Sequence, residues 1–215
     1  MTRFSIKIEN ILGLSYYRYE LTSSTYNATI NTAFTITCKC TDVFGNNVSG
    51  KQLTLYGNGT SIGTANTDSN GIATWNISPS TLGKINYNVS NAYCQVDIND
   101  TGWKNATMKS GWTAYDSNST LQYRRIRNIV EVSGIVKPTS NKTGTAHEVA
   151  TISDSNCRPL KPVRFYSSGF GNYHFITYVN TEGTIGFDRH YNGTTSQSSA
   201  TTDNAFIMNG RYIVK

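Results

Sequence analysis

Charged side chains are scarce in this sequence of 215 residues. Asp, Glu, Lys and Arg together make up only 15% of it, and no long stretch combines the Ala, Leu, Glu and Lys of an amphipathic helix. Asn, Thr, Ser, Gly and Tyr are abundant instead. This composition is typical of strands joined by polar turns, so we expect an all-β protein.

Long apolar runs are also missing. No segment approaches the ~20 apolar residues that a membrane-spanning helix needs, so we expect no membrane insertion. The first residues alternate through Phe4, Ile6 and Ile8, whereas a signal peptide has a continuous apolar centre. A protein with an extracellular type of composition and no export signal is what we expect of a virus particle component, because virus particles leave their host by lysis.

Catalytic and metal-binding motifs are absent as well. His147-Glu148 is followed by Thr151 where a zinc-protease motif needs histidine, and His174 and His190 add no ligand spacing. The 13 acidic residues are scattered, without a pair that separates an acid from a base. We therefore expect no catalytic residues, no metal, no cofactor and no enzyme activity.

Cysteines are few: Cys38, Cys40, Cys94 and Cys157. Their spacing is not that of a structural zinc site. Cys38 and Cys40 alternate in phase with Phe34, and Cys94 in phase with Val96, so these three thiols should point into a core. A bridge from Cys94 to Cys38 or Cys40 is sterically conceivable. We favour buried free thiols, as in a particle assembled in the host cytoplasm.

The chain carries a net charge of +6 and a pI near 9.1. A basic surface attracts anionic polymers, either on a cell surface or in nucleic acid. A solvated, mildly basic surface without a specific partner explains the same charge. We predict a cell-surface partner and expect that the protein does not bind nucleic acid.

Residues 21–99 show strand-like runs separated by turn clusters at the spacing of a β-sandwich. Two turn motifs stand out, Thr41-Asp42-x-x-Gly45-Asn46 and Thr67-Asp68-x-x-Gly71. With the strands between them, they resemble bacterial and archaeal Ig-like surface modules. The resemblance implies an Ig-like β-sandwich and specifies no activity.

The strongest strand pattern lies in residues 111–138. Val130, Val132 and Val136 point one way and Ile129 and Ile135 the other, which predicts a hairpin of two long strands. Further along, Tyr173, Phe175 and Val179 alternate with Ile176 and Tyr178. The strands expected in this half are 120–126, 128–137, 145–153, 162–168, 172–180, 183–190 and 204–214.

The pattern from Trp112 through Tyr123-Arg124-Arg125-Ile126-x-Asn128 to Gly134 resembles the receptor-binding heads of tailed-virus tail and baseplate proteins. Asn156-Cys157-Arg158-Pro159 and Val179–Ile185 extend the resemblance. Two departures are Arg127, where that family has glycine, and Cys157, where it has an aromatic residue. The resemblance implies a jelly-roll-like β-sandwich, a homotrimer and contact with a host cell. In that trimer, Ile129, Ile135 or Ile176 would lie at the subunit contact.

These patterns divide the chain into four parts. We expect an N-terminal attachment strand in residues 1–20, an Ig-like domain in 21–99, a linker in 100–108 and a receptor-binding-like head in 109–215. The attachment strand would meet a neighbouring domain or other virion tail proteins, and an extra strand of the next domain is the alternative. Trp103 and Met108 would stiffen the linker by docking.

Aromatic side chains are the best lead to a binding site, because sugar rings stack their apolar C–H face on aromatic rings while polar neighbours bind the hydroxyl groups. The predicted ligand-binding residues are Tyr166, Phe170, Tyr173, His174, Asp188, Arg189 and Tyr191. Ordinary packing of a sandwich accounts for any one of them equally. The arginines of residues 123–127 suit phosphate, a solvated strand face or a subunit contact.

The function expected from these observations is a non-catalytic virus tail adhesin, located at the tail tip or fibre and binding a host cell-surface glycan or glycoprotein. Two alternatives come from other classes. One is a cellular Ig-like surface adhesin, favoured by the first half of the chain. The other is a polysaccharide-degrading tail enzyme, which needs two carboxylates converging in a groove.

Overall fold

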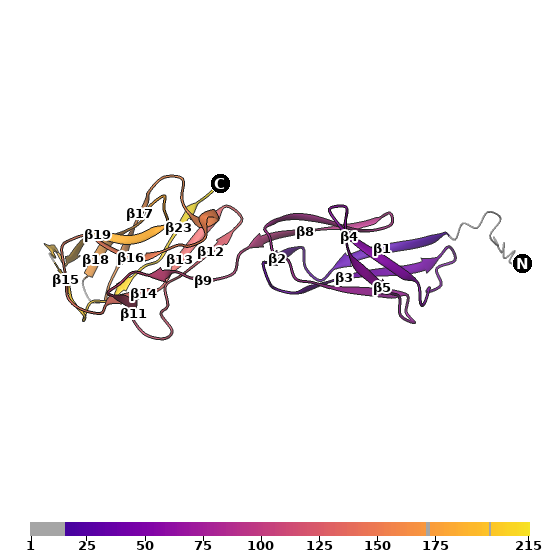
Figure 1. The fold of residues 1–215 in the computed structure, drawn as a ribbon, viewed down its shortest axis with the longest axis horizontal. Helices are drawn as coiled ribbons and strands as arrows, with labels where there is room; N and C mark the ends of the chain where they lie inside the picture. Colours follow the sequence, from indigo (N-terminus) through magenta and orange to yellow (C-terminus); the bar gives the residue numbers. More distant parts are fainter. Residues whose placement is uncertain (1–15, 171–172, 198) are drawn as a thin grey trace, which may run out of the picture. The chain divides into compact units, whose positions relative to one another are not determined.

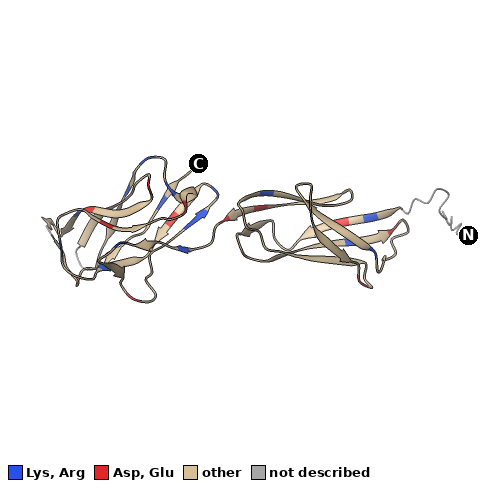
Figure 2. Ribbon diagram, in the orientation of Figure 1, with Lys and Arg blue, Asp and Glu red and all other residues tan. Residues whose placement is uncertain are grey.

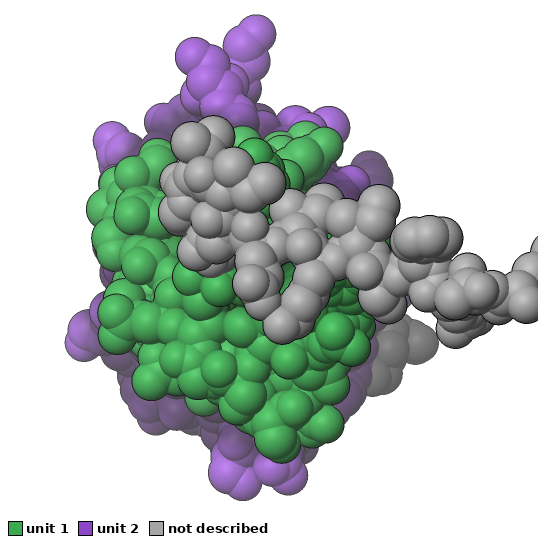
Figure 3. Space-filling model, turned by 90° about the vertical axis from the view of Figure 1, so that its right-hand side faces the viewer, with its two compact units in different colours: residues 1–98 green, residues 99–215 purple. Residues whose placement is uncertain are grey.

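A computed structural model describes residues 16–170, 173–197 and 199–215, which form strands and a single short 3₁₀ turn (Figure 1). The all-β prediction is therefore confirmed. The chain divides into two compact units, residues 1–98 and 99–215, which Figure 3 shows in different colours. The expected strand through Phe4, Ile6 and Ile8 lies outside the described residues.

The first unit is a sandwich of two antiparallel sheets. One sheet contains β1 (Tyr17–Ser23), β3 (Phe34–Asp42) and β6 (Ile72–Ile77). The other contains β2 (Asn27–Thr29), β8 (Ala92–Asp100), β7 (Gly83–Val89), β4 (Gln52–Gly57) and β5 (Thr60–Asn66). Alternate residues of these strands, such as Ile36, Leu55 and Val96, are fully buried between the sheets. This is the Ig-like arrangement expected from the sequence.

The second unit packs several sheets around one core. One sheet is formed by β9 (Lys104–Asn105), β12 (Gln122–Ile126), β13 (Ile129–Ser133) and β23 (Gly210–Ile213). Another is formed by β10 (Thr107–Met108), β16 (His147–Thr151), β19 (Thr184–Asn192), β18 (Tyr173–Val179) and β17 (Val163–Ser168), with β20 (Thr195–Ser196) on β19. Smaller pairings are β11 (Trp112–Ala114), β14 (Ile135–Pro138) and β22 (Phe206–Ile207), and β15 (Lys142–Thr143) with β21 (Ser199–Ala200).

Aromatic rings fill the centre of the second unit. The rings of Phe187 and Phe206 stack with their centroids 4.3 Å apart. Trp112 meets both rings edge-on, at 5.6 and 5.9 Å, and Phe175 lies 5.3 Å from Phe187. Ring pairs at these separations contribute about 0.5–1.5 kcal/mol each beyond their buried area. Phe187 therefore joins residues from β11, β18, β19 and β22.

The predicted hairpin forms with a tight turn at Arg127 and Asn128. Ile126 pairs with Ile129, so the turn consists of Arg127 and Asn128 alone. Arg127 adopts a positive φ of 54°. A left-handed backbone costs a non-glycine residue roughly 1–2 kcal/mol, which explains why glycine suits this position. The Arg127 N–H donates to the Asn99 carbonyl at 2.6 Å and holds the turn.

The single strand predicted over residues 128–137 is in fact two strands that belong to different sheets. The break falls at Gly134, where the Leu121 backbone approaches so closely that a Cβ would lie 2.5 Å from the Leu121 Cα. Val130, Val132 and Val136 nevertheless all point into the core, as the alternation predicts. Gly134 therefore lets one apolar run serve two sheets.

Residues 100–108 do not form the expected linker. Thr101 N–H donates to the Arg125 carbonyl at 2.8 Å, and β9 pairs with β12. Two residues later, β10 pairs with β16 in the other sheet. Strands of two residues are too short to show a period of two, so composition alone suggested a linker. This segment is part of the second unit.

The same turn occurs three times among the described residues. In Asp42-x-x-Gly45 and Asp68-x-x-Gly71, the aspartate Oδ1 accepts the N–H groups two and four residues later, at 2.8–2.9 Å. Asn180-x-x-Gly183 repeats this geometry with an amide oxygen, at 3.1 and 2.8 Å. The first two are the motifs that carry the Ig-like resemblance, so its turn chemistry is realised here.

All four cysteines are free and buried. Burial raises the pKa of the Cys38 thiol to about 12 and that of Cys157 to about 11. Burial also raises the pKa of Cys40 and Cys94. The thiolate is the reactive form, so these groups are shielded both by access and by protonation.

We expect a thiol reagent to react slowly with the native protein at pH 8 and with all four cysteines once the protein is denatured without reductant. Mass spectrometry after labelling measures both states. A free cysteine added at exposed Ser69 serves as the reactive control. Loss of two thiols in the denatured, unreduced sample would demonstrate a disulfide and contradict the expectation.

Replacing Gly134 by Ala should lower the free energy of unfolding by about 1–3 kcal/mol, because the methyl group meets the Leu121 backbone. Gly63→Ala is the matched control: nothing lies within 4 Å of the added Cβ, and the change should stay within ±0.5 kcal/mol. Urea unfolding followed by circular dichroism measures both. Equal stability of the two variants would show that the strand break does not depend on glycine.

Candidate ligand-binding face of the second unit

Four neighbouring strands of the second unit present a continuous outward surface, which we call the outer face. It is built from cross-strand rows on β17, β18, β19 and β16. The rows are Ser168, His174 and Tyr191; then Tyr166, Ile176 and Asp188; then Arg164, Tyr178, Gly186 and Glu148. Directly opposed side chains in such rows lie close enough to act as one surface.

Rings stand out on this face. Tyr166 has 86% of its surface exposed, and His174 stacks on Tyr191 with centroids 5.3 Å apart and planes 13° from parallel. Tyr178 lies across Gly186, where a Cβ would come within 2.5 Å of its hydroxyl oxygen. The absence of a side chain at Gly186 therefore allows one more ring to lie against the sheet.

A β-bulge in β19 creates this arrangement. Between its pairs with His174 and Ile176, β19 has two residues, Arg189 and His190, opposite the single Phe175 of β18. Arg189 takes the left-handed φ of 52° that such bulges use. The alternation of the strand is shifted there, so Phe187 and His190 both enter the core while Asp188 and Tyr191 both face outward.

The outer face carries the charged side chains Arg164, Asp188 and Glu148. Arg164 Nη2 lies 3.6 Å from Asp188 Oδ2, while the buried Asp188 Oδ1 has no hydrogen-bond partner among the described residues. Burial raises the pKa of Tyr178, and the Glu148 and Asp188 carboxylates raise it further, so its hydroxyl stays protonated. The face thus offers a phenol, a guanidinium and a carboxylate to the hydroxyl groups of a ligand.

The predicted site residues do not all meet. Tyr166, His174, Asp188 and Tyr191 share the outer face. Phe170 instead packs edge-on against Tyr115, with centroids 5.1 Å apart.

The other two predicted residues are also displaced from this face. Tyr173 alternates to the opposite side of β18 from His174, and its Cβ lies 2.9 Å from where a Cβ on Gly169 would stand. Arg189 is the bulge residue, and its N–H donates to the Thr145 carbonyl at 3.1 Å. Tyr173 begins strand β18 and Arg189 lies in the bulge of β19, and neither placement could follow from proximity in sequence.

Sequence reasoning missed Tyr178 and Arg164 as members of the face. Tyr178 follows His174 and Ile176 at the spacing of two that places residues on one side of a strand, and that spacing was available beforehand. Arg164 could be added only once β17 was known to pair with β18.

Two of the histidines, His147 and His190, are buried in the core of the second unit. His147 lies 6.2 Å from His190 between centroids, and both pack on Phe187. The Nε2 of His147 lies 2.9 Å from the Gly144 carbonyl, and that of His190 lies 2.8 Å from the Ser199 carbonyl. Across the described part of the chain, no three His, Cys, Asp or Glu side chains gather as a metal site would require.

The structure also bears on two general expectations. No helix among the described residues has the length and apolarity to cross a membrane.

The arginines of β12 are engaged internally: Arg124 Nε donates to Glu131 at 2.7 Å and Arg125 Nη1 to the Asn156 carbonyl at 2.8 Å. Figure 2 shows how few charges either unit carries.

No protein-family model matches this chain, and no curated protein matches it. Similar solved structures include a protein of Corynebacterium diphtheriae described as membrane anchored, at 12% identity and a TM-score of 0.38, covering 91% of this chain and 50% of that one. The Escherichia coli adhesin FdeC is 13% identical with a TM-score of 0.38, covering 85% and 63%. The Yersinia pseudotuberculosis adhesin InvE is 11% identical with a TM-score of 0.33, covering 92% and 58%.

The chain thus spans between half and two thirds of the length of these three solved chains. At such TM-scores the likeness assigns neither a function nor a partner. None of the three is a virus tail protein, so the resemblance of residues 112–215 to tail heads finds no counterpart among them.

Burial holds the pKa of His147 below its usual value. The hydrogen bond to the Gly144 carbonyl raises this pKa, while nearby His190 and Lys142 lower it further. Below about pH 6.5 the unfolded chain protonates this histidine before the folded protein does. We therefore expect the free energy of unfolding to fall as pH decreases from 6.5. Urea unfolding at several pH values measures the slope.

The matched variants are His147→Gln and His174→Gln. The first should flatten the dependence of stability on pH below 6.5, because the group that binds the proton is gone. The second changes a histidine of the outer face and should leave the His147 contribution in place. Equal slopes in wild type and His147→Gln would show that His147 does not control acid stability.

Proposed function

We propose that this chain is the ligand-binding part of a cell-surface adhesin, and that the outer face contacts a cell-surface glycan or glycoprotein without catalysis. The observation that carries the proposal is the exposed ring of Tyr166 beside the stacked pair of His174 and Tyr191. Sugars bind to such rings through their C–H faces while Asp188 and Arg164 bind hydroxyl groups.

The first unit favours an adhesin displayed by a cell over one carried by a virus particle. Its Asp42 and Asp68 turns form with the geometry that the motif of Ig-like surface modules requires. In this proposal the first unit is a spacer that holds the second away from the surface. A virus tail adhesin is the second candidate, favoured by the hairpin turn at Arg127 and Asn128, which forms where that resemblance places it.

Multivalency belongs to the proposal. Shallow sugar sites are weak singly, and several sites that engage together raise the avidity by orders of magnitude. A homotrimer would provide this through the exposed Ile129, which pairs with exposed Ile213 on the neighbouring strand. Ile176 lies in the centre of the outer face, so we exclude it from the subunit contact that the sequence suggested.

The test uses the full chain, biotinylated at its N-terminus and tetramerised on streptavidin, applied to a printed array of neutral and acidic glycans. Binding to the glycans that the outer face recognises should fall about 5- to 150-fold in Tyr166→Ala and in Tyr191→Ala, as about 1–3 kcal/mol for a central contact implies. Urea unfolding should be unchanged in Tyr166→Ala, because that ring is exposed.

Tyr93→Ala is the control, since Tyr93 is an exposed tyrosine of the first unit, with 80% of its surface accessible. Loss of binding in Tyr93→Ala with retention in Tyr166→Ala would reverse the roles of the two units. Binding to no glycan and to no isolated cell envelope would refute the adhesin proposal.

A further inference from the structure

The outward face of the other sheet of the second unit carries a groove that the sequence did not indicate. It runs along β12, β13 and β23 beside Trp103, whose side chain is 44% exposed. Trp75 and Trp112 are each only 7% exposed, so Trp103 is the one tryptophan of this chain that solvent reaches freely. An exposed indole next to a hollow needs an explanation beyond folding.

The position of Trp103 is fixed by the backbone on both sides of it. Thr101 and Arg125 exchange two hydrogen bonds, from the Thr101 N–H and to the Thr101 hydroxyl, both 2.8 Å long. Gly102 has a φ of +66° and donates its N–H to Asp100 Oδ1 at 2.8 Å, and Lys104 pairs with Tyr123. The indole is therefore held over β12 before any ligand arrives.

One side of the indole is supported by a charged row. The Arg124 guanidinium lies 4.6 Å from the ring centroid, a cation–π distance. Glu131 holds this arginine at 2.7 Å through one carboxylate oxygen and Arg211 at 2.6 Å through the other. The three residues are direct cross-strand neighbours on β12, β13 and β23. A hollow of about 480 Å³ lies over this row.

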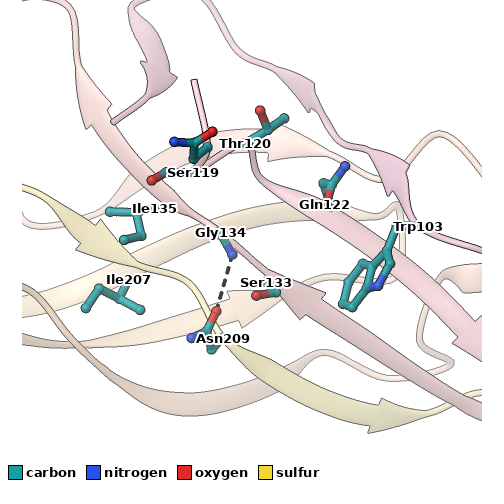
Figure 4. A pocket seen from close by; sticks show the side chains of 10 residues that line it. Trp103, Ser119, Thr120, Gln122, Ser133, Gly134, Ile135, Ile207 and Asn209 are labelled. Atoms are coloured by element: carbon teal, nitrogen blue, oxygen red, sulfur yellow. Dashed lines mark hydrogen bonds between the residues drawn. The ribbon is translucent and has the colours of Figure 1, made fainter. Parts of the chain in front are cut away.

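The other hollow, of about 400 Å³, is uncharged (Figure 4). Trp103 stands at one end of it and Ile135 and Ile207 at the other, with polar side chains between. Gln122 Nε2 donates to Asn105 at 2.8 Å, and Asn209 Oδ1 accepts from the Gly134 N–H at 3.2 Å. One end of each amide is fixed, and the other end has no partner among the described residues.

We propose that this Trp103 groove binds a neutral saccharide of two or more rings. An aromatic wall, amide and hydroxyl groups and a small apolar floor match the alternating C–H and O–H surface of a pyranose. Each hollow lies in the range of about 300–1,000 Å³ that small-ligand sites occupy. The arginines of the groove are paired with Glu131, so an uncharged sugar fits better than a carboxylated or phosphorylated one.

One oxygen of Glu131 accepts a hydrogen bond from Arg124 and the other forms an ion pair with Arg211, which makes this carboxylate a support for Arg124 and Trp103. The groove is separate from the outer face, since none of the residues that line it lies on β16, β17, β18 or β19. The proposal therefore stands independently of ligand binding at the outer face. Two such sites on different strands would let one protein bind two chains of a glycan layer.

The experiment applies the full chain, again as a streptavidin tetramer, to the same array of neutral and acidic glycans. We expect neutral oligosaccharides to bind, and Trp103→Ala to lose at least about 10-fold of that binding while Tyr166→Ala keeps it. Trp103→Phe should retain part of it, since a ring remains. In solution, the bound oligosaccharide should protect the wild-type protein from acrylamide quenching of tryptophan fluorescence, because Trp103 is the accessible indole.

Several outcomes would overturn the proposal. These are unchanged binding in Trp103→Ala, binding to acidic glycans only, no glycan binding at all, or an oligomer that dissociates in Trp103→Ala, which would make the indole a subunit contact. Loss in Tyr166→Ala with retention in Trp103→Ala would support the outer face and refute the groove. The reverse pattern would support the groove and refute the outer face. Unfolding midpoints of all variants exclude misfolding as the cause.

Discussion

The ring cluster around Phe187 is the contact on which the outer face depends. Its stacking on Phe206, together with Trp112 and Phe175, joins four strands of the second unit at one point. Strand residues alternate between two faces, so each ring fixed inward fixes its neighbours outward. Phe187 thereby directs Asp188 to the outer face, and Phe175 directs His174. The set of side chains on the outer face is thus determined by packing in the core.

The two candidate surfaces use different physical chemistry. The outer face presents rings along neighbouring strands, with Arg164 and Asp188 as its polar pair. The Trp103 groove is concave and confines its charges to the row held by Glu131. Rings spread over several strands suit a broad polymer surface, whereas a groove suits a single chain. An adhesin that meets a layered glycan would benefit from both.

Much of the fold followed from period-two patterns, and the rest was hidden for identifiable reasons. The alternation that includes Val130 and Val132 predicted a buried strand, because a period of two over several residues can be recognised without knowing the tertiary structure. The bulge at Arg189 and the break at Gly134 depend on what lies opposite them, which no single segment encodes. Trp103 was misplaced in a linker because its neighbouring strands are two residues long. For the outer face, the choice of aromatic side chains and their polar neighbours supplied four of seven predicted residues, and strand pairing was needed for Arg164.

The short strands β9 and β10 determine how the second unit responds to mechanical tension. In the proposed adhesin, a ligand held by this unit pulls against the chain that arrives from the first unit, and that chain is hydrogen-bonded first to β12 and then, two residues later, to β16. Tension is therefore delivered to both sheets within a few residues of the point where it arrives. Backbone hydrogen bonds of both sheets must break before the ring cluster is exposed, so survival under force is governed by the rate of unfolding rather than by stability at rest.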